Sequence, residues 1–377
     1  MQLQPTEEQS QMAQALRRWI ERTQPAPGGR LRGSDPGARA DAWAALSSLG
    51  LPALLVPQAL GGLGASRQDA LQALEALAPA LLPEPVASSC VLATLLLVLG
   101  VDGTATRGWL REMALGRCMA TPAVFEPAAD FDLDHPQTRA VRDAGGWRID
   151  GEKTRVLQAP SADLLLVSAR VEDGGLGWFG VPADSAGLEL RPCTLFDGQA
   201  AADLSLRAVP LDAQARIDAP GSGTRMAAEL RATWLAALCA EAVGLLQAVV
   251  DATVRYLNTR EQFGAPIGRL QALQHRAADL WMELEQARSM AWLAADACAG
   301  AQSRPTQALL AAAKARVGQA CRRVSQESIQ LHGGMGMTDE LPVSHWFRRL
   351  TTIELWLGDS DAHLQQVARA ELPCQAD

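Results

Sequence analysis

The sequence predicts a multidomain α+β protein in which a helical domain, a β-rich domain and a helical bundle follow one another. Three observations indicate this order. Apolar residues recur every three to four positions in the first 118 residues, short β-prone runs separated by glycine, proline and aspartate come next, and long alanine- and leucine-rich stretches fill the remainder. We therefore expect an N-terminal all-α domain at residues 1–118, a middle domain at 119–222 and a C-terminal helical domain at 223–377. A chain of 377 residues has room for two or three domains.

Helical periodicity defines the first predicted domain. Met12, Leu16 and Ile20 recur at four-residue spacing, which places them on one face of a helix. Glycines at 61–64 and prolines at 83 and 85 mark turns between the helical segments. The predicted helices cover residues 8–20, 40–49, 67–77 and 86–99.

The middle and C-terminal domains differ in the period of their apolar residues. Short strands bounded by glycine, proline and aspartate are typical of a small β-barrel or sandwich. Three long helices and a shorter fourth are typical of a four-helix bundle. The predicted strands cover residues 147–153, 164–168, 178–181, 188–191 and 202–206, and the predicted long helices cover 228–258, 270–299 and 306–331.

Composition excludes several classes of function. The net charge of −8 makes the chain a poor binder of phosphate backbones, so we expect no nucleic-acid partner. The seven cysteines are scattered without a C-x-x-C pair, which predicts neither a disulfide framework nor a metal site and fits a reducing cytoplasmic setting. The start of the chain is polar, and the longest mainly apolar stretch, 91–99, is shorter than the ~20 residues that span a bilayer. We therefore expect no membrane partner.

The segment from Arg260 to Asp279, REQFGAPIGRLQALQHRAAD, is the most informative in the chain. The predicted helices on either side leave a glycine- and proline-containing turn with an arginine, a side-chain amide and an aromatic ring. Arginine binds phosphate oxygens in a bidentate manner, and amides complement the edges of a heterocycle. Residue chemistry alone is equally compatible with a polar turn between two helices.

A second segment, Gln330 to Glu340, reads QLHGGMGMTDE. Successive glycines allow the backbone to approach a ligand closely and expose N–H groups, as a phosphate-binding loop requires. A glycine cluster after a helix is also explained by a helix C-cap. We assign His332 a local structural role and no catalytic one.

Both segments resemble signatures of the acyl-CoA dehydrogenase family, R-x-Q-F-G-x-P-I-G-x-x-Q-x-x-Q-x-x-x-A-D and Q-x-H-G-G-x-G-x-T-x-E. The resemblance covers essentially the whole chain and implies an N-terminal helical domain, a middle β-barrel and a C-terminal four-helix bundle. It also implies FAD as the cofactor, with Arg260 at the pyrophosphate of an FAD bound mainly by a neighbouring subunit. The remaining cofactor contacts implied by the resemblance are Gln262, Phe263, Gln271, Gln330, Gly333 and Gly334.

The family reaction converts an acyl-CoA thioester to the trans-2-enoyl-CoA and passes electrons to an electron-transfer flavoprotein. It needs a carboxylate base, and the two positions where relatives carry one hold Leu357 and Trp234, neither of which accepts a proton. Glu241 is the remaining candidate for the catalytic base, because it lies on the same predicted helix face as Trp234. The alternative for Glu241 is a subunit-interface residue paired with an arginine.

The positions that normally contact the flavin ring also differ from the family pattern. Glu126 and Pro127 persist, but Phe125 stands where relatives carry a threonine, and Arg155 begins the run that replaces their W-I-T. The resemblance therefore implies a changed flavin environment. Arg155 either meets a negative group on the substrate or flavin or is a surface or salt-bridged residue.

Three further segments resemble a subgroup of the family, the small subunits of pimeloyl-CoA-type and steroid side-chain dehydrogenases. They are Glu84–Val86, Cys239–Gly244 and Leu357–His363. The resemblance implies a homo-oligomer or a heterotetramer with a related large subunit. Two alternatives stay open: a non-catalytic partner subunit that completes a neighbour's FAD site, and a flavin oxidase or monooxygenase on the same fold.

Overall fold

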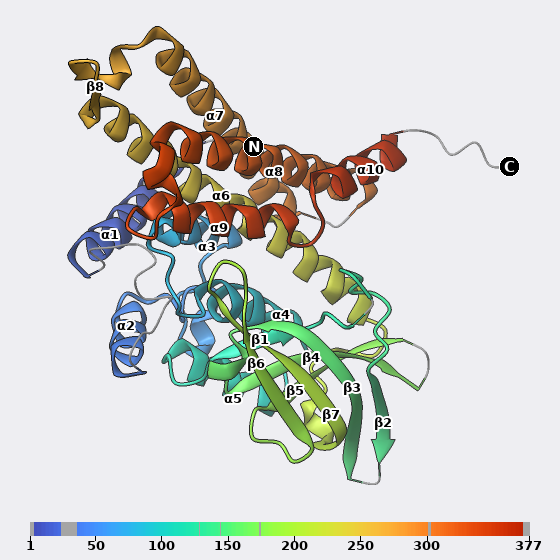
Figure 1. The fold of residues 1–377 in the computed structure, drawn as a ribbon. Coiled ribbons are helices and arrows are strands. Elements are labelled where there is room, and N and C mark those ends of the chain that lie inside the picture. The colour runs from blue at the N-terminus through green and yellow to red at the C-terminus, as the bar shows by residue number, and fades with distance from the viewer. Residues whose placement is uncertain are drawn as a thin grey trace, which may run out of the picture. The chain divides into compact units, whose positions relative to one another are not determined.

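The computed structural model describes residues 4–23, 36–127, 129–143, 145–172, 175–300 and 303–371 (Figure 1). The chain divides into two compact units. We call residues 1–32, 71–82 and 232–377 the helical unit, and residues 33–70 and 83–231 the mixed unit. The predicted domain boundaries at residues 118 and 222 stay a prediction.

A seven-stranded sheet forms the mixed unit's centre, in the order β1-β4-β2-β3-β7-β6, with β5 paired to β4. β1 and β2 each run parallel to part of β4, and the other pairs are antiparallel. Register shifts between β3 and β7 help the sheet to curl, as the predicted β-barrel requires (Figure 1). The strands are β1 (Ala120–Ala123), β2 (Arg139–Asp143), β3 (Gly146–Leu157), β4 (Leu164–Val171), β5 (Leu176–Pro182), β6 (Leu188–Thr194) and β7 (Ala200–Asp212).

All five predicted strands are present, and β1 and β2 are additional. β1 has the sequence Ala-Thr-Pro-Ala and is buried throughout, so it carries neither the alternation nor the β-branched run that identifies a strand. The core inside the sheet contains alternate residues of β3 and β7, among them Trp147, Ile149 and Val209.

Helices of the mixed unit include α2 (Pro36–Ser48), α4 (Thr94–Leu99) and α5 (Thr104–Ala114), while α3 (Arg67–Leu77) continues from this unit into the helical one. The buried helix predicted at 86–99 is present but changes its winding, because Val86–Ala93 is a π-helix and only α4 is α-helical. The N–H and the hydroxyl of Thr94 both donate to the carbonyl of Ser89, five residues earlier. That double donation supports the wider winding at the end of the π-helix.

The helical unit contains α1 (Glu7–Thr23), most of α6 (Gly223–Thr259), α7 (Gln271–Ala299), α8 (Arg304–His332), α9 (Pro342–Leu355) and α10 (Ser360–Glu371). The three predicted long helices are confirmed. Two shorter helices follow them in the described part of the chain, where the sequence predicted one. The buried positions of α1 include Leu16, as predicted, together with Ala13 and Trp19, so its packed face is rotated slightly from the one expected.

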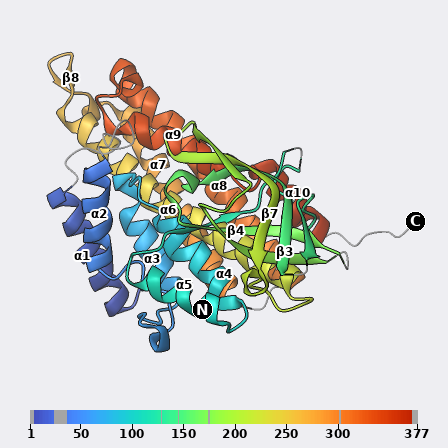
Figure 2. The same cartoon turned by 90° about the horizontal axis from the view of Figure 1, so that it is seen from below.

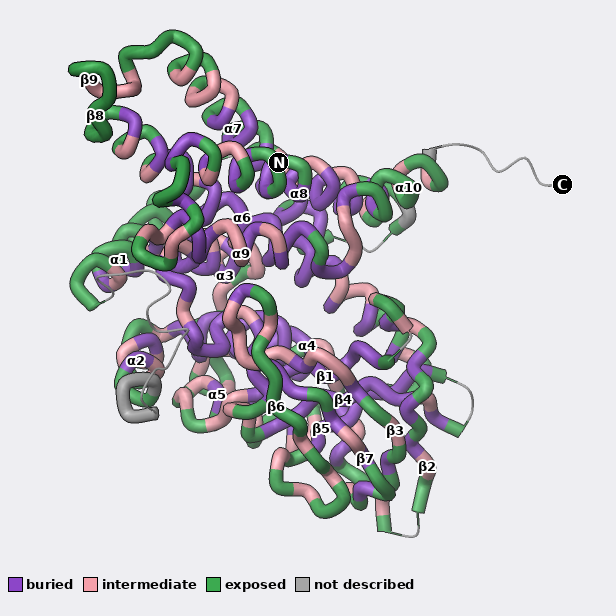
Figure 3. The backbone as a smooth tube through the Cα atoms, in the orientation of Figure 1, coloured by how far each residue is buried: buried purple, intermediate pink, exposed green. Residues whose placement is uncertain are grey.

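α6 is the most apolar long helix of the chain, and its composition needs an explanation. Its best 18-residue window has a mean hydropathy of 1.7, which is apolar enough to cross a membrane, but 83% of that window is buried by protein. Figure 3 shows this buried path along α6. Packing at the centre of a helical unit accounts for the apolarity.

The order of the long helices decides where the candidate site lies. α8 packs along α7, and Arg288 of α7 donates to Gln247 of α6. The Tyr256 ring near the end of α6 contacts the His332 ring at the end of α8, and α7 begins after the hairpin that follows α6. Figure 1 and Figure 2 both show the β8 hairpin at this end of α6 and α7. The two predicted cofactor segments, at 260–271 and 330–334, are therefore brought to one end of the helical unit.

Candidate functional site

A two-stranded hairpin carries the first cofactor segment. β8 (Glu261–Gln262) pairs with β9 (Ala265–Pro266), and the Ile267 N–H donates to the Arg260 carbonyl at 2.9 Å to close the hairpin. The two turn residues, Phe263 and Gly264, both have positive φ values, 55° and 78°. A two-residue turn with this geometry matches the twist of the strands but favours asparagine and glycine over an aromatic residue. Phenylalanine at the tip is therefore conformationally less favourable for this turn than asparagine or glycine would be.

The predicted side chains of this segment face solvent in the isolated chain. Phe263 is 95% exposed, and Arg260, Gln262 and Gln271 are exposed as well. Among the described residues, Arg260 has no ion-pair partner, and the Gln262 amide donates to the adjacent Glu261 carbonyl at 2.9 Å. A rigid hairpin with an exposed aromatic tip and an available guanidinium is suited to contact another molecule.

The second segment begins where α8 ends. Gly333 has φ 60° and ψ −142°, a conformation that is essentially reserved for glycine. A Cβ atom added at Gly333 or Gly334 would meet nothing within 4 Å, so their backbone is open to a ligand. At Gly336, by contrast, a Cβ atom would lie 2.8 Å from the Ile329 carbonyl oxygen, which anchors the segment against α8. Gln330 is exposed at the same helix end.

A stacked ring pair places the two segments side by side. The Tyr256 ring on α6 lies 4.5 Å from the His332 ring on α8, with 30° between their planes. His332 is buried, and its Nδ1 donates to the Ser328 carbonyl at 2.8 Å. Burial lowers the pKa of His332, outweighing that hydrogen bond. These contacts are what a structural histidine makes.

Local charge favours an anionic ligand at this end. Residues 255–269 contain three arginines and one glutamate, whereas the chain as a whole has a net charge of −8. Arg255, Arg260 and Arg269 are all exposed. A locally positive surface with open backbone N–H groups attracts phosphate.

Trp234 and Leu357, which occupy the two usual base positions, lie near each other in another part of the helical unit. The Trp234 ring lies 6.3 Å from the ring of Trp356, which directly precedes Leu357. All three side chains are buried, with 5%, 8% and 8% exposed. Apolar side chains thus fill the place where relatives carry a carboxylate.

Glu241 lies seven residues from Trp234 on α6 and is held by Arg349 of α9. The Arg349 guanidinium donates to both Glu241 carboxylate oxygens at 2.6 Å, and the two side chains are 15% and 8% exposed. This bidentate pair matches the alternative left open for Glu241, but the arginine belongs to the same chain. The catalytic role of Glu241 stays a prediction.

A buried lysine, which sequence reasoning missed, supports the turn that carries Leu357. Lys314 of α8 is fully buried and donates to the carbonyls of Glu354 and Gly358 at 2.9 and 3.1 Å. The Glu354 carboxylate accepts from Arg322 at 2.7 Å and from Ser360, so it is used structurally. Burial lowers the pKa of Lys314. No sequence signal marks this lysine, because its partners lie about 40 residues away.

Glu126, one of the residues that match the family pattern, has a structural role in the mixed unit. Its carboxylate accepts from Lys153 at 2.7 Å and from the Thr138 hydroxyl at 2.6 Å, inside the sheet. Burial opposes the charged form of Glu126, but Lys153, Thr138 and Gln137 outweigh it and leave its pKa below the usual value. Burial lowers the pKa of Lys153 to about 8, against the opposing effect of Glu126. This pair holds the loop that follows β1.

Arg155 packs on aromatic rings, an arrangement that sequence reasoning did not foresee. Its guanidinium carbon lies 5.8 Å from the Phe125 ring centre and 5.4 Å from that of Phe131. Its backbone has φ 53°, and its N–H donates to Asp203 at 3.0 Å. The position that faces the flavin ring in relatives is thus occupied here by a cation–π cluster.

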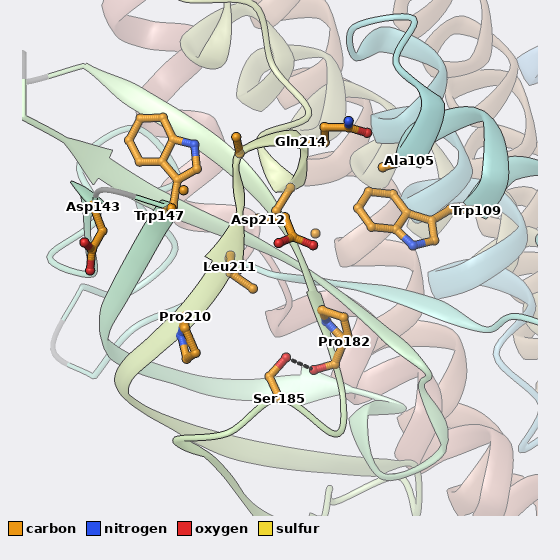
Figure 4. Close-up of a pocket in the computed structure, with 15 residues that line it drawn as sticks. Ala105, Trp109, Asp143, Trp147, Pro182, Ser185, Pro210, Leu211, Asp212 and Gln214 are labelled. Carbon is orange, nitrogen blue, oxygen red and sulfur yellow. Dashed lines mark hydrogen bonds between the residues drawn. The ribbon is translucent and has the colours of Figure 1, made fainter.

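The mixed unit contains a separate cavity of about 930 Å³. Figure 4 shows the residues that line it. Trp109, Trp147, Asp143 and Asp212 contribute to its walls. None of the predicted site residues lines it. Within the described ranges, no group of three or more His, Cys, Asp or Glu residues is placed to hold a metal ion.

Comparison with known proteins assigns the chain to a family. Family models match it in three consecutive stretches, the acyl-CoA dehydrogenase N-terminal domain at residues 6–117, the middle domain at 121–209 and the C-terminal domain at 221–372. The probable acyl-CoA dehydrogenase YngJ of Bacillus subtilis (strain 168) is 30% identical over 274 residues, covering 69% of this chain and 70% of that protein. The chain belongs to the acyl-CoA dehydrogenase family. It is therefore an oxidoreductase of this family, and the predicted fold class is confirmed.

Two solved structures are similar over nearly the whole chain. The ChsE4–ChsE5 complex from Mycobacterium tuberculosis contains a chain that is 25% identical, with a TM-score of 0.86 and coverage of 99% of this chain and 100% of that one. The Tcur3481–Tcur3483 steroid ACAD is 28% identical, with a TM-score of 0.85 and 97% coverage of both chains. The first is a complex of ChsE4 and ChsE5, and the second carries the two names Tcur3481 and Tcur3483.

The acyl-CoA dehydrogenase family implies FAD, and the two units differ in how well they suit it. In the helical unit, Arg260 and the open backbone at Gly333 and Gly334 suit the diphosphate and adenosine half of the cofactor. In the mixed unit, Phe125 and Arg155 replace the residues that relatives place against the flavin ring. The cofactor residues named from the sequence therefore gather as a group, but their contact with FAD stays a prediction.

Proposed function

We propose that this chain is one subunit of an FAD-dependent acyl-CoA dehydrogenase and shares an FAD site with a neighbouring subunit. The observation that carries the proposal is the pairing of the exposed Arg260 hairpin with the open Gly333–Gly334 backbone at one end of the helical unit. The Phe263 side chain at the hairpin tip is 95% exposed, which supports a neighbouring subunit that supplies the rest of the site.

The proposed reaction oxidises an acyl-CoA thioester to the trans-2-enoyl-CoA, with an electron-transfer flavoprotein as acceptor. FAD supplies the hydride-accepting chemistry, and the protein supplies binding, orientation and a base. In this chain Arg260 would reach the diphosphate, and Gln262, Phe263 and Gln271 would line the cofactor that is bound mainly by the neighbouring subunit. The similarity to chains of two-component assemblies supports a heterotetramer with a related large subunit.

A second candidate is a non-catalytic partner subunit, favoured by one specific observation. Trp234 and Leu357 occupy the two usual base positions, and Glu241 is engaged by Arg349. In that case the large subunit supplies the carboxylate, and this chain completes the cofactor site.

Flavin reduction tests the proposal. The chain is purified alone and together with the product of any adjacent homologous gene. The bleaching of its flavin absorbance is followed anaerobically with a panel of acyl-CoA thioesters. We expect yellow protein whose flavin an acyl-CoA bleaches when both chains are present. Protein that is colourless in both forms, or flavin that no thioester reduces, would refute the dehydrogenase assignment.

The same preparations separate the alternatives. Bleaching by the chain alone would show that it contains its own base, whereas bleaching only in the complex supports the partner-subunit role. Reduced flavin that reoxidises rapidly in air would instead indicate an oxidase or monooxygenase.

A further inference from the structure

The Tyr256–His332 stack joins two segments that lie more than 70 residues apart in sequence. Tyr256 is in the last turn of α6, and His332 is the last residue of α8. Their rings are 4.5 Å apart and 30° from parallel, a stacked arrangement. His332 belongs to the second motif, but neither it nor Tyr256 is among the predicted cofactor contacts, so the ring contact has a separate role to explain.

On the α6 side, Tyr256 controls the start of the hairpin. Its carbonyl accepts the Arg260 N–H at 2.8 Å, and the Arg260 carbonyl in turn accepts the Ile267 N–H at 2.9 Å. A Cβ atom at Gly268 would lie 2.9 Å from the Leu257 carbonyl, so the far end of the hairpin also packs against this helix end. A shift of Tyr256 would therefore move the whole hairpin.

On the α8 side, His332 controls the start of the glycine segment. Gly333 follows it directly, and a Cβ atom at Gly336 would lie 3.0 Å from the His332 Cβ atom. The Nδ1 hydrogen bond to the Ser328 carbonyl fixes the ring, because a carbonyl only accepts and Nδ1 must carry the hydrogen. The flat ring that meets Tyr256 is thus rigidly oriented.

We propose that Tyr256 and His332 are positioning residues that hold the Arg260 hairpin and the Gly333–Gly334 backbone in register for one FAD. Neither ring is needed as a contact to the reacting atoms. The stack fixes the separation between a guanidinium and a set of backbone N–H groups, both of which bind phosphate. This inference rests on the proposed function, because it assumes that the two segments share one ligand.

A double-mutant cycle in the assembled two-chain protein tests the inference through FAD affinity, measured by flavin fluorescence. Tyr256→Phe keeps the ring, and we expect the FAD dissociation constant of this variant to stay within about twofold of the wild-type value. Tyr256→Leu removes the stack. Because an aromatic pair contributes about 0.5–1.5 kcal/mol, we expect FAD affinity to fall by roughly threefold to tenfold. If the stack acts by placing Arg260, the effects of Tyr256→Leu and Arg260→Ala will be less than additive.

His332→Leu probes the same contact from α8 and keeps the test usable if Tyr256→Leu fails to assemble. We expect the same weakening and the same non-additivity with Arg260→Ala. Unchanged FAD affinity in either leucine variant, or effects that add fully, would overturn the positioning role. If Arg260→Ala itself leaves FAD affinity unchanged, the proposed cofactor site fails first, and the two failures are distinguishable.

Discussion

Glu241 and Arg349 show how a residue named as a candidate base can have another use. The two hydrogen bonds of 2.6 Å neutralise the carboxylate in a largely buried setting. Arg349 is seven residues before Trp356, and Glu241 is seven residues after Trp234, so the ion pair and the tryptophan pair are neighbouring contacts between antiparallel helices. The pair fixes α9 against α6 next to the place where relatives carry their base.

Substitution at this pair separates structure from catalysis. Arg349→Met leaves a mostly buried carboxylate without its cation, which typically costs about 3–5 kcal/mol, whereas the double variant Glu241→Leu, Arg349→Met is expected to lose less. Urea denaturation measures both. If the pair is structural, Glu241→Gln will keep most of the turnover of the assembled enzyme. A catalytic base would lose about 10²-fold or more, and such a loss would restore Glu241 as the base.

Family resemblance named part of the candidate site, and the structure added contacts that no local pattern marks. Arg260, Phe263 and Gly333 belong to contiguous motifs that resemble the family signatures, and their contact with the cofactor stays a prediction. Arg349 and Lys314 act through partners 108 and about 40 residues away, and no local pattern marks such pairs. Arg155 was singled out by its position, but its packing on Phe125 and Phe131 depends on the curl of the sheet.

Among the elements, the β8–β9 hairpin shows the clearest conflict between local preference and use. Phe263 has a positive φ of 55° at a position where asparagine is favoured, and its ring is 95% exposed. Phe263 is unfavourable for its own turn and buries little surface in its own chain. The proposed contact with a neighbouring subunit and its cofactor accounts for a phenylalanine at this position.

Phe263→Asn therefore gives opposite results in two assays. The isolated chain should keep or gain stability, by up to about 1 kcal/mol, because asparagine suits the turn. The two-chain assembly should retain FAD less well, because the exposed aromatic contact is lost. Thermal unfolding of the single chain and flavin retention after gel filtration measure the two effects. A variant that retains FAD as well as wild type does would argue against a neighbour at the tip.

For other elements, the periodicity of apolar residues was sufficient to predict the helix bounds. The long helices α6, α7 and α8 were expected close to their observed ends, because each combines length with a repeating apolar face. β1 escaped prediction because its four residues include a proline and are all buried. The π-helical winding of Val86–Ala93 is likewise invisible to a pattern that only reports burial.

For the whole molecule, the fold class followed from the order of helical, β and helical segments, and the family from two motifs. The same motifs imply a site that one chain does not complete. The helical unit presents an exposed Arg260 and the open backbone of Gly333 and Gly334 at one end, while Trp234 and Leu357 occupy both usual base positions. An enzyme built from this chain and a related subunit accounts for both facts.

In the proposed enzyme, the Arg260 hairpin contributes to an FAD shared between subunits. The most direct measurement is the FAD dissociation constant of the assembled protein carrying Arg260→Ala, compared with Arg17→Ala, a substitution of an exposed arginine on α1. Loss of a bidentate phosphate contact should weaken FAD binding by about tenfold or more, since charged hydrogen bonds contribute roughly 1.5–3 kcal/mol. Arg17→Ala should leave the constant unchanged. Equal affinity in the two variants, with assembly intact, would contradict the account.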